Sequence, residues 1–316
     1  MDVVTFGETM VLFTPETTGF MRYAHTYSRK FGGSETNFAI GLARLGHRVG
    51  WISRVGDDEL GKALLAFVRG EGVDVSRVRL DPDAPTGIYF KEIRSANDVN
   101  VYYYRKGSAA SRMTPGDLDE EYLAQAKYLF VSGITPALSD TCRAMTQAAI
   151  TLAKKHGLTV VFDPNLRKKL WPEEQARETL LALAAQADIV LPGLSEGEFL
   201  FGESDPLKLG RRFLEHGAQT VVLKLGEGGA HYFTRETDEY IPGYRVDRVV
   251  DPVGAGDGFA AGFVSGLLDG LPMADAVRRA NAVGAIVTMV NGDVEGLPER
   301  ADLKRFAEEP NEEVIR

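Results

Sequence analysis

The segment from Asp251 to Phe263, DPVGAGDGFAAGF, combines a carboxylate with a site suited to an anion. Gly254 and Gly256 precede Asp257, and the apolar residues that follow have the spacing of one helix face. The first N–H groups of a helix lack partners and carry partial positive charge, and glycine lets an anion approach them closely. A carboxylate placed there could accept the proton of a hydroxyl group that attacks phosphorus. The alternative is that Asp257 only caps the helix, a role worth about 1 kcal/mol.

A second glycine pair, Gly32 and Gly33, precedes a predicted helix from Ser34 to Leu45. The apolar residues of this segment have helical spacing, and Gly46 follows it, as glycine commonly follows the end of a helix. A plain turn would explain the glycine pair when it is taken alone.

Two predicted strands, Thr86 to Ile93 and Asn100 to Arg105, form an antiparallel hairpin with its turn at Ala96-Asn97-Asp98. The second strand gathers three tyrosines and two cations, and Tyr89 lies on the first. These residues are Tyr102, Tyr103, Tyr104, Arg105 and Lys106. One interpretation is an ordinary aromatic sheet face, because aromatic residues favour strands. The other is a lid over a polyhydroxylated anionic ligand, with Arg105 binding a carboxylate or phosphate in bidentate fashion.

The rest of the chain alternates between strands and helices, and residues 9–31 have the pattern of short strands and turns. Strands are predicted at 3–6, 51–54, 128–132, 159–162, 188–191 and 220–224, with more over 239–250. Helices are predicted at 34–45, near 60–68, and at 117–126, 139–156, 173–186, 207–216 and 274–290, with short or terminal ones near 196 and from 299. This alternation indicates a mostly parallel sheet with right-handed crossovers.

Ligands of such sheets bind beyond the carboxyl ends of the strands. The residues at these ends are Gly7, Asn165, Arg167, Gly193, Lys224 and Gly226. A glycine-rich turn runs from Lys224 to Ala230, and either a β-hairpin or a backbone that passes close to a nucleotide would explain it.

Composition and charge exclude several classes of protein. With 316 residues, 44% hydrophobic and 26% charged, the chain can form one large α/β domain with a sizeable core. The net charge of −9 argues against a nucleic-acid partner but allows a local basic pocket for an acidic small molecule. Cys142 is the only cysteine, so no intrachain disulfide can form. We find no signal peptide and no membrane span, and we expect a cytoplasmic protein.

The chain resembles the ribokinase-like (PfkB) carbohydrate kinases over nearly its whole length. Two motifs in the right order carry the resemblance: Gly32-Gly33 with Asn37, and Asp251 to Asp257; the turn after Lys224 and Asn281 also match. The resemblance implies a single α/β domain over residues 1–316, with a mostly parallel central sheet flanked by helices. A small β lid would form from about residues 9–31 and 86–106. The implied activity is phosphorylation of a sugar hydroxyl by ATP with Mg²⁺.

The resemblance also assigns roles to single residues. Asp257 would be the catalytic base, and the amides of Gly254, Ala255 and Gly256 would bind the transferring phosphoryl group. The residues assigned to the substrate are Gly33, Asn37, Tyr89, Tyr103, Tyr104, Arg105, Arg167, Asp257 and Asp293. Those assigned to the nucleotide are Asn165, Arg167, Lys224, Gly226, Gly229, Gly254, Ala255, Gly256 and Asn281.

Within the family, the chain is most similar to the kinases that phosphorylate the 6-hydroxyl of 2-keto-3-deoxygluconate in the Entner–Doudoroff pathway. The resemblance implies that Arg105 and Arg167 hold the substrate carboxylate. A fructokinase-like enzyme for a neutral sugar is the alternative, and it would leave a buried guanidinium unpaired, which is costly. The family also implies a homo-oligomer, such as a dimer formed through the lids.

The chain departs from the family pattern at the expected metal site. Family members often carry Asn-x-x-Glu near residue 190, whereas this chain has Gly193 and only Glu196, which would act on Mg²⁺ indirectly. Asp251 could belong to a site for a monovalent cation such as K⁺.

Two other classes of function fit less well. A dinucleotide-dependent oxidoreductase would need Gly-x-Gly-x-x-Gly after the first strand, where the chain has Gly7-Glu8-Thr9-Met10. A non-catalytic sensor on the same fold would be expected to lack the base, and Asp257 is present.

Overall fold

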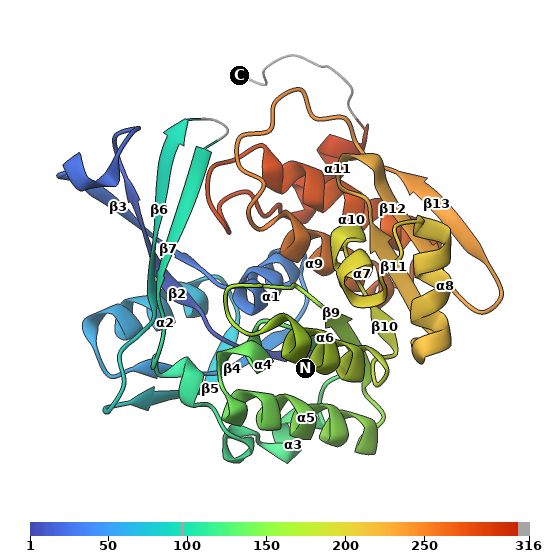
Figure 1. The fold of residues 1–316 in the computed structure, drawn as a ribbon, viewed down its shortest axis with the longest axis horizontal. Helices are drawn as coiled ribbons and strands as arrows, with labels where there is room; N and C mark the ends of the chain where they lie inside the picture. The colour runs from blue at the N-terminus through green and yellow to red at the C-terminus, as the bar shows by residue number, and fades with distance from the viewer. Residues whose placement is uncertain (96–97, 309–316) are drawn as a thin grey trace.

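Nine strands form one sheet in the computed structural model, which describes residues 1–95 and 98–308 (Figure 1). The turn expected at Ala96-Asn97-Asp98 therefore lies largely outside the described residues. The strand order is β13-β12-β11-β10-β9-β8-β1-β4-β5, parallel from β5 to β11 and antiparallel at β12 and β13. The bounds are β1 Val3–Phe6, β4 Val49–Gly56, β5 Asp74–Asp81, β8 Tyr128–Ser132, β9 Thr159–Asp163, β10 Ile189–Val190, β11 Thr220–Lys224, β12 Gly229–Phe233 and β13 Asp238–Pro242.

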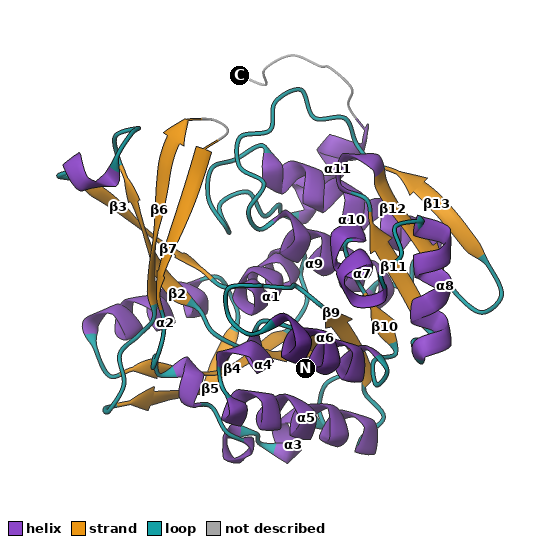
Figure 2. Cartoon of the chain, viewed as in Figure 1, coloured by secondary structure: helices purple, strands orange, loops and turns teal. Residues whose placement is uncertain are grey.

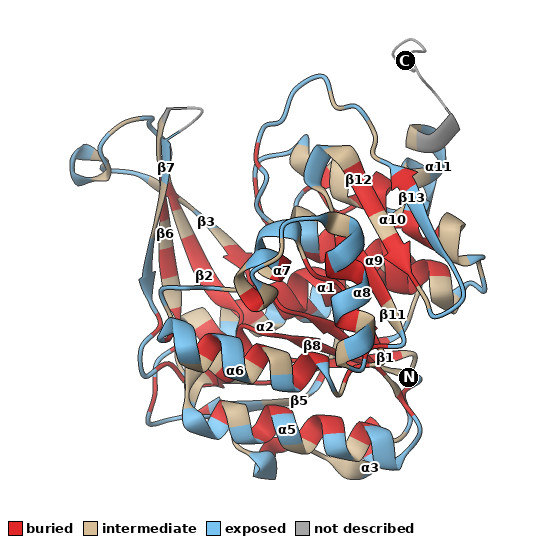
Figure 3. Cartoon of the chain, turned by 45° about the vertical axis from the view of Figure 1, so that its right-hand side comes forward, coloured by how far each residue is buried: buried red, intermediate tan, exposed pale blue. Residues whose placement is uncertain are grey.

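Helices cover both faces of this sheet (Figure 2). Successive strand residues point to opposite faces, so Val3 packs in one core cluster and Val4 in the other. The first face is covered by α1 Ser34–Arg44, α2 Glu59–Gly70, α9 Ala255–Leu268 and α10 Met273–Thr288. The second is covered by α3 Glu120–Leu123, α4 Thr135–Leu138, α5 Asp140–Lys155, α6 Glu173–Ala184, α7 Leu194–Phe201 and α8 Pro206–His216. Figure 3 shows the buried residues gathered in the strands and on the helix faces turned toward them.

Four strands form a second, smaller sheet beside the first, which we call the small sheet (Figure 1). Its order is β3 Tyr27–Gly32, β2 Met10–Pro15, β6 Ile88–Ser95 and β7 Asp98–Tyr104. The β2–β3 and β6–β7 pairs are antiparallel, whereas β2 and β6 run parallel. The strands fall within the ranges 9–31 and 86–106 or within one residue of them.

The central helix α9 packs unusually close to its neighbours because glycines line it. A Cβ atom added to Gly262 would lie 3.0 Å from the Cα of Ala280, and one on Gly266 would lie 2.7 Å from the Cα of Ala276, both on α10. On the other side, a Cβ at Gly41 of α1 would lie 2.8 Å from the Cβ of Ala261. This packing fixes the start of α9 relative to the start of α1.

The structure differs from the sequence predictions at three elements. The strands expected over 239–250 end at Pro242, and Val249 and Val250 lie exposed in a loop. Their residue types favour a strand, but no neighbouring strand in the described part of the chain pairs with this segment. The edge strand β5 was not predicted, because its exposed side carries the charged residues that edge strands tolerate. The helix expected at 117–126 is reduced to the single turn α3.

Short 3₁₀ helices and a terminal helix complete the described chain. They are η1 Met21–Tyr23, η2 Ala110–Arg112, η3 Pro115–Asp117, η4 Gly226–Gly228 and α11 Arg300–Glu308. Within the described residues, the longest apolar helices fall short of what a bilayer crossing requires.

Candidate active site

The N-terminus of α9 is shaped by Gly254. This residue has φ of 83°, in the left-handed region, and a Cβ there would lie 2.6 Å from the carbonyl oxygen of Asp293. Glycine is therefore required both for the backbone conformation and for the space. The backbone then enters α9 at Ala255, with Gly256 and Asp257 in its first turn, so unpaired N–H groups and a carboxylate stand together.

Three segments that are far apart in sequence meet at the carboxylate of Asp257. Ser34 Oγ donates to Oδ1 at 2.6 Å, and Asn37 Nδ2 donates to Oδ2 at 2.8 Å, both from α1. Asn165, which follows β9, donates from Nδ2 to Ser34 Oγ at 2.7 Å and approaches Asp257 Oδ1 at 3.5 Å. The structure thus brings Asp257, Asn37 and Asn165 together. Both carboxylate oxygens have a fixed donor, which holds the group in one orientation.

Burial raises the pKa of Asp257 above its ordinary range. The hydrogen bonds from Ser34 and Asn37 and the charges of Arg167 and Lys224 oppose this shift. A carboxylate with a raised pKa is a stronger base, and it lies next to the free amides of α9. The arrangement can therefore take a proton from a hydroxyl group and stabilise negative charge beside it.

Asn37 and Gly33 form a hydrogen bond at the start of α1. Gly33 N donates to Asn37 Oδ1 at 3.3 Å, which leaves the Asn37 amide nitrogen to face Asp257. A Cβ at Gly33 would lie 2.3 Å from the carbonyl oxygen of Glu8. Glycine is needed here for space, since its φ of −176° is ordinary extended backbone. Asn37, assigned to the substrate from the sequence, contacts the carboxylate of Asp257 in this structure.

Lys224 lies at the carboxyl end of β11 and pairs with Asp163 at 2.7 Å. Burial lowers the pKa of Lys224, but the charges of Asp163 and Glu196 outweigh this and hold the pKa above its usual value. Glu196 accepts hydrogen bonds from the backbone of Gly193 at 2.7 Å and Leu166 at 2.8 Å. These contacts place one cation and two carboxylates next to the start of α9.

A cavity of about 640 Å³ opens beside this cluster. The predicted residues that line it are Lys224, Gly226, Gly229, Ala255, Gly256 and Asn281. Gly229 has φ of 96°, and a Cβ on it would lie 2.3 Å from the nitrogen of Gly243, so the backbone forms the wall directly. Asn281 Nδ2 donates to the carbonyls of Ile241 and Pro242 at 3.2 and 3.1 Å, which ties α10 to β13.

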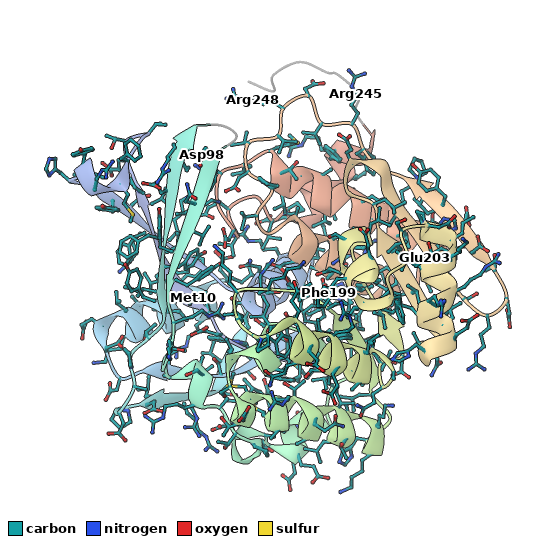
Figure 4. The ribbon with its side chains drawn as sticks, viewed as in Figure 1. Met10, Asp98, Phe199, Glu203, Arg245 and Arg248 are labelled. Atoms are coloured by element: carbon teal, nitrogen blue, oxygen red, sulfur yellow. The ribbon has the colours of Figure 1, made fainter. Side chains whose placement is uncertain are left out.

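A further cation, Arg245, belongs to the loop between β13 and α9. It is part of the lining of this cavity, and Arg245 and Arg248 are labelled along this loop in Figure 4. The size of the cavity, its glycine walls and its cations fit a nucleoside triphosphate. No cluster of three or more metal-ligating side chains occurs in the part of the chain that the structure describes. A Mg²⁺ ion therefore fits as a companion of bound phosphates, because Mg²⁺ commonly binds through phosphates, waters and one or two carboxylates.

On the opposite side of the site, Tyr89 and Tyr103 of the small sheet lie next to Asp293, which belongs to the loop after α10. Tyr89 OH donates to Asp293 Oδ2 at 2.7 Å, and the rings of Tyr89 and Tyr103 stack at 5.7 Å. Burial raises the pKa of Asp293 to about 6. Its Oδ1 is buried without a hydrogen-bond partner among the described residues. Tyr104 lies on the other face of the strand, against Phe90, so the structure does not bring it together with the other tyrosines.

Arg105 and Arg167 differ in their surroundings. Arg105 is 9% exposed, and its guanidinium is bound to Glu8, with Nη2 and Oε2 2.6 Å apart. The expectation that a neutral ligand would leave Arg105 unpaired is wrong, because Glu8 already neutralises it. Arg167 is exposed, and its charge opposes the rise in the pKa of Asp257 that burial causes.

Several residues in this site were not singled out from the sequence, among them Glu8, Ser34 and Lys91, which pairs with Asp251. Glu8 directly follows the first strand, where only the neighbouring Gly7 was noted. Lys91 shares a strand face with Tyr89, since the two are separated by one residue. Strand alternation could have found Lys91, but no spacing rule identifies Ser34, whose role depends on how α1 meets α9.

Comparisons with known proteins extend over almost the whole chain. Residues 1–300 match the sequence profile of the pfkB family of carbohydrate kinases. The 2-dehydro-3-deoxygluconokinase of Bacillus subtilis (strain 168) is 45% identical over 308 residues, which are 97% of this chain and 95% of that protein. A PfkB protein from Polaromonas sp. JS666 has a crystal structure with a TM-score of 0.88 and 43% identity, covering 96% of this chain and 99% of that one. The crystal structure of 2-dehydro-3-deoxygluconokinase from Thermotoga maritima has a TM-score of 0.90 and 26% identity, covering 97% and 99%.

Proposed function

Because the chain belongs to the pfkB family of carbohydrate kinases and has the ribokinase-like fold, we propose that it phosphorylates the 6-hydroxyl of 2-keto-3-deoxygluconate, also called 2-dehydro-3-deoxygluconate. The product would be 2-keto-3-deoxy-6-phosphogluconate. The 45% identity to the Bacillus subtilis enzyme of that name supports this choice of substrate.

The observation that carries the proposal is the fixed carboxylate of Asp257 at the N-terminus of α9. Its buried position raises its pKa, and it lies beside the backbone amides of residues 254 to 256. In the proposed reaction, Asp257 accepts the proton of the 6-hydroxyl while these amides stabilise the negative charge on the transferring group. Ser34 and Asn37 keep the carboxylate aimed at the hydroxyl.

ATP would supply the phosphoryl group, with Mg²⁺ offsetting the charge of its phosphates. We assign the nucleotide to the cavity beside Lys224, with its phosphates toward Gly256 and Lys224 and its base toward Asn281. Glu196 holds the loops after β9 and β10 through backbone bonds, so its effect on the metal would be indirect.

For the sugar acid, we propose a site between the small sheet and α9. The sugar would bond to Asp293 Oδ1, which is buried without a partner among the described residues, and to the hydroxyls of Tyr89 and Tyr103 beside it. Arg167 would bind the carboxylate as an exposed cation, and Arg105 would contribute the guanidinium edge that Glu8 leaves open. Tyr104 is left out of this site because of its position on the other face.

A neutral sugar such as fructose remains the second candidate, and the Arg105–Glu8 pair is the observation that favours it. A neutralised arginine does not require an anionic ligand, so the pocket can hold a hydroxyl without an uncompensated buried charge. Arg167 is then the cation on which selectivity for the acid depends.

The decisive test is the release of ADP from magnesium-ATP with 2-keto-3-deoxygluconate, gluconate, fructose, ribose and adenosine as acceptors. We expect the highest kcat/KM for the keto-deoxy acid. A preference for fructose or ribose would contradict the assigned substrate and leave the kinase assignment intact.

We further propose that the enzyme works in the cytoplasm and forms a dimer through its small sheets. Apolar side chains are exposed on this sheet and the turn beside it: Phe20, Tyr23, Val99, Tyr102 and Tyr104. Burying them between two copies would remove apolar surface from water. Analytical ultracentrifugation tests the dimer, and a monomer at assay concentrations would contradict it.

A further inference from the structure

One buried ion pair joins the small sheet to the loop that begins α9. Lys91 of β6 and Asp251 are 2% and 6% exposed, and the Lys91 ammonium donates to Asp251 Oδ2. Removing two charges from water is costly unless each finds a partner and further hydrogen bonds. The pair is therefore a specific feature of the site and not a chance surface contact.

The remaining bonds of Asp251 are also made within the protein. Oδ2 accepts a second hydrogen bond from Gly292 N at 3.3 Å, and Oδ1 accepts one from Val253 N at 3.2 Å. Val253 leads directly into Gly254, and a Cβ at Gly254 would touch the carbonyl of Asp293. Asp251 therefore connects two loops that together shape the amides at the start of α9.

Two further residues of the small sheet, besides Lys91, make polar contacts with these loops. Tyr89, on the same face of β6, donates to Asp293. Lys30 of β3 donates to the carbonyl of Asn291 at 2.8 Å and pairs with Glu295 at 3.4 Å. Two cations and one hydroxyl of the small sheet thus meet the carboxylates and carbonyls next to the proposed anion site.

A K⁺ ion at Asp251, which the sequence left open, does not fit this arrangement. An alkali ion needs several oxygen ligands, and at Asp251 it would stand beside an ammonium that already neutralises this carboxylate. We propose that Lys91 supplies the positive charge at Asp251 in place of a monovalent cation, so that the small sheet itself completes the anion-binding loop of α9. The enzyme is then independent of alkali cations, and its phosphoryl-transfer site is ordered only when the small sheet is docked.

This inference rests on the proposed kinase function, and its first test requires no variant. ADP formation is measured in KCl, NaCl and tetramethylammonium chloride at equal ionic strength, together with the thermal unfolding midpoint in each salt. We expect the same kcat, KM and midpoint in all three. Activation by K⁺ over tetramethylammonium, or a higher midpoint in K⁺ alone, would overturn the proposal. Absence of phosphorylation in every salt would instead refute the proposed function.

The second test removes the ammonium and asks whether a small cation can replace it. Lys91→Met keeps an unbranched apolar stem and removes the ammonium at its end. We expect kcat to fall by about 10²-fold in tetramethylammonium, because the amides lose their fixed geometry. K⁺ should restore a substantial part of this loss, since the vacated space beside Asp251 then admits it. Lys62→Met, which removes an exposed lysine of α2, is the matched control and should behave as wild type in every salt. A folded Lys91→Met enzyme with unchanged kcat, or with the same loss in every salt, would overturn the assignment.

Discussion

The two sides of the proposed site hold their carboxylates in different ways. Asp257, between α1 and α9, has a donor on each oxygen, and these donors come from the fold itself. Asp293, which faces the small sheet, has one oxygen bonded to Tyr89 and the other buried without a partner among the described residues. A carboxylate whose two oxygens both accept hydrogen bonds from the protein is held in one orientation for catalysis. A carboxylate with an oxygen that accepts no hydrogen bond is suited to bind a ligand. The helix side thus fits catalysis, and the sheet side fits recognition.

The largest effect is expected at the helix side. Asp257→Asn removes the proton acceptor but keeps the size of the side chain, so kcat should fall by about 10²- to 10⁴-fold. The Kd for ADP, measured by calorimetry, should stay near the wild-type value because the nucleotide cavity is unchanged. Nearly full activity in this variant would show that Asp257 is not the proton acceptor, and the two sides of the site would then not differ as we infer.

Glu35 is an exception on the helix side, because it is fully buried with its Oε2 unpartnered among the described residues. Burial raises its pKa to about 7. The folded state then binds the proton more tightly than the unfolded state, so its contribution to stability is full below the ordinary pKa near 4.5. That contribution is lost as the pH rises toward 7. Glu35→Gln should abolish this loss and stabilise the protein at pH 8 by up to roughly 3 kcal/mol.

Urea unfolding at several pH values measures the effect of Glu35→Gln. The control is Glu178→Gln, an exposed position on α6, which should leave the pH dependence unchanged. Parallel stability curves for wild type and Glu35→Gln would contradict this prediction and show that Glu35 is ionised in the folded protein without a cost in stability.

Arg105→Ala tests the sheet side. If the guanidinium binds the substrate carboxylate, KM for 2-keto-3-deoxygluconate should rise by about 10- to 100-fold. KM for the analogue with a carboxamide in place of the carboxylate should rise much less. Both substrates are measured with the same variant, so any movement of Glu8 that follows the loss of its partner changes both KM values equally. An equal rise for both would restrict Arg105 to its pair with Glu8.

The smallest effect is expected from a matched pair on one strand. Tyr103→Phe should raise KM for the sugar acid by about 2- to 10-fold, the effect of one lost neutral hydrogen bond. Tyr104→Phe should leave KM unchanged, because this ring lies on the other face of the small sheet. Steady-state kinetics on both variants measures these KM values. A larger rise in KM for Tyr104→Phe than for Tyr103→Phe would contradict our assignment of the substrate to the face that carries Tyr103.

Much of the fold could be predicted from local pattern. Strands such as β1 and β8 are short apolar runs, and α1 and α9 have apolar spacing and glycines at their starts, so period and turn chemistry identify them. The two errors in the predicted strands have a common cause. Residues 243–250 have a strand-like composition but no neighbouring strand, and β5 is polar because it lies at an edge. Pairing partners decide both cases, and a single segment does not contain that information.

Only those parts of the site that lie within one short segment could be predicted from the sequence. Asp257 and Gly254 lie in one short motif, so the sequence identifies them together. Glu8 neutralises Arg105 across nearly a hundred residues of chain, and Lys91 reaches Asp251 from another sheet. Such pairs depend on three-dimensional packing, and charge composition alone does not reveal which cation meets which carboxylate.

The glycines of α9 also bear on how the chain is made. Four of the fourteen residues of this helix are glycine, and each disfavours a helix by about 1 kcal/mol relative to alanine. Alone, α9 would be largely unfolded, so it must be held by α10, which ends only at Thr288. During synthesis, the helix that carries Asp257 can therefore form only after the residues up to the end of α10 have left the ribosome. A nascent chain that stops before the end of α10 lacks a completed phosphoryl-transfer site, so it cannot consume ATP before this helix pair has formed.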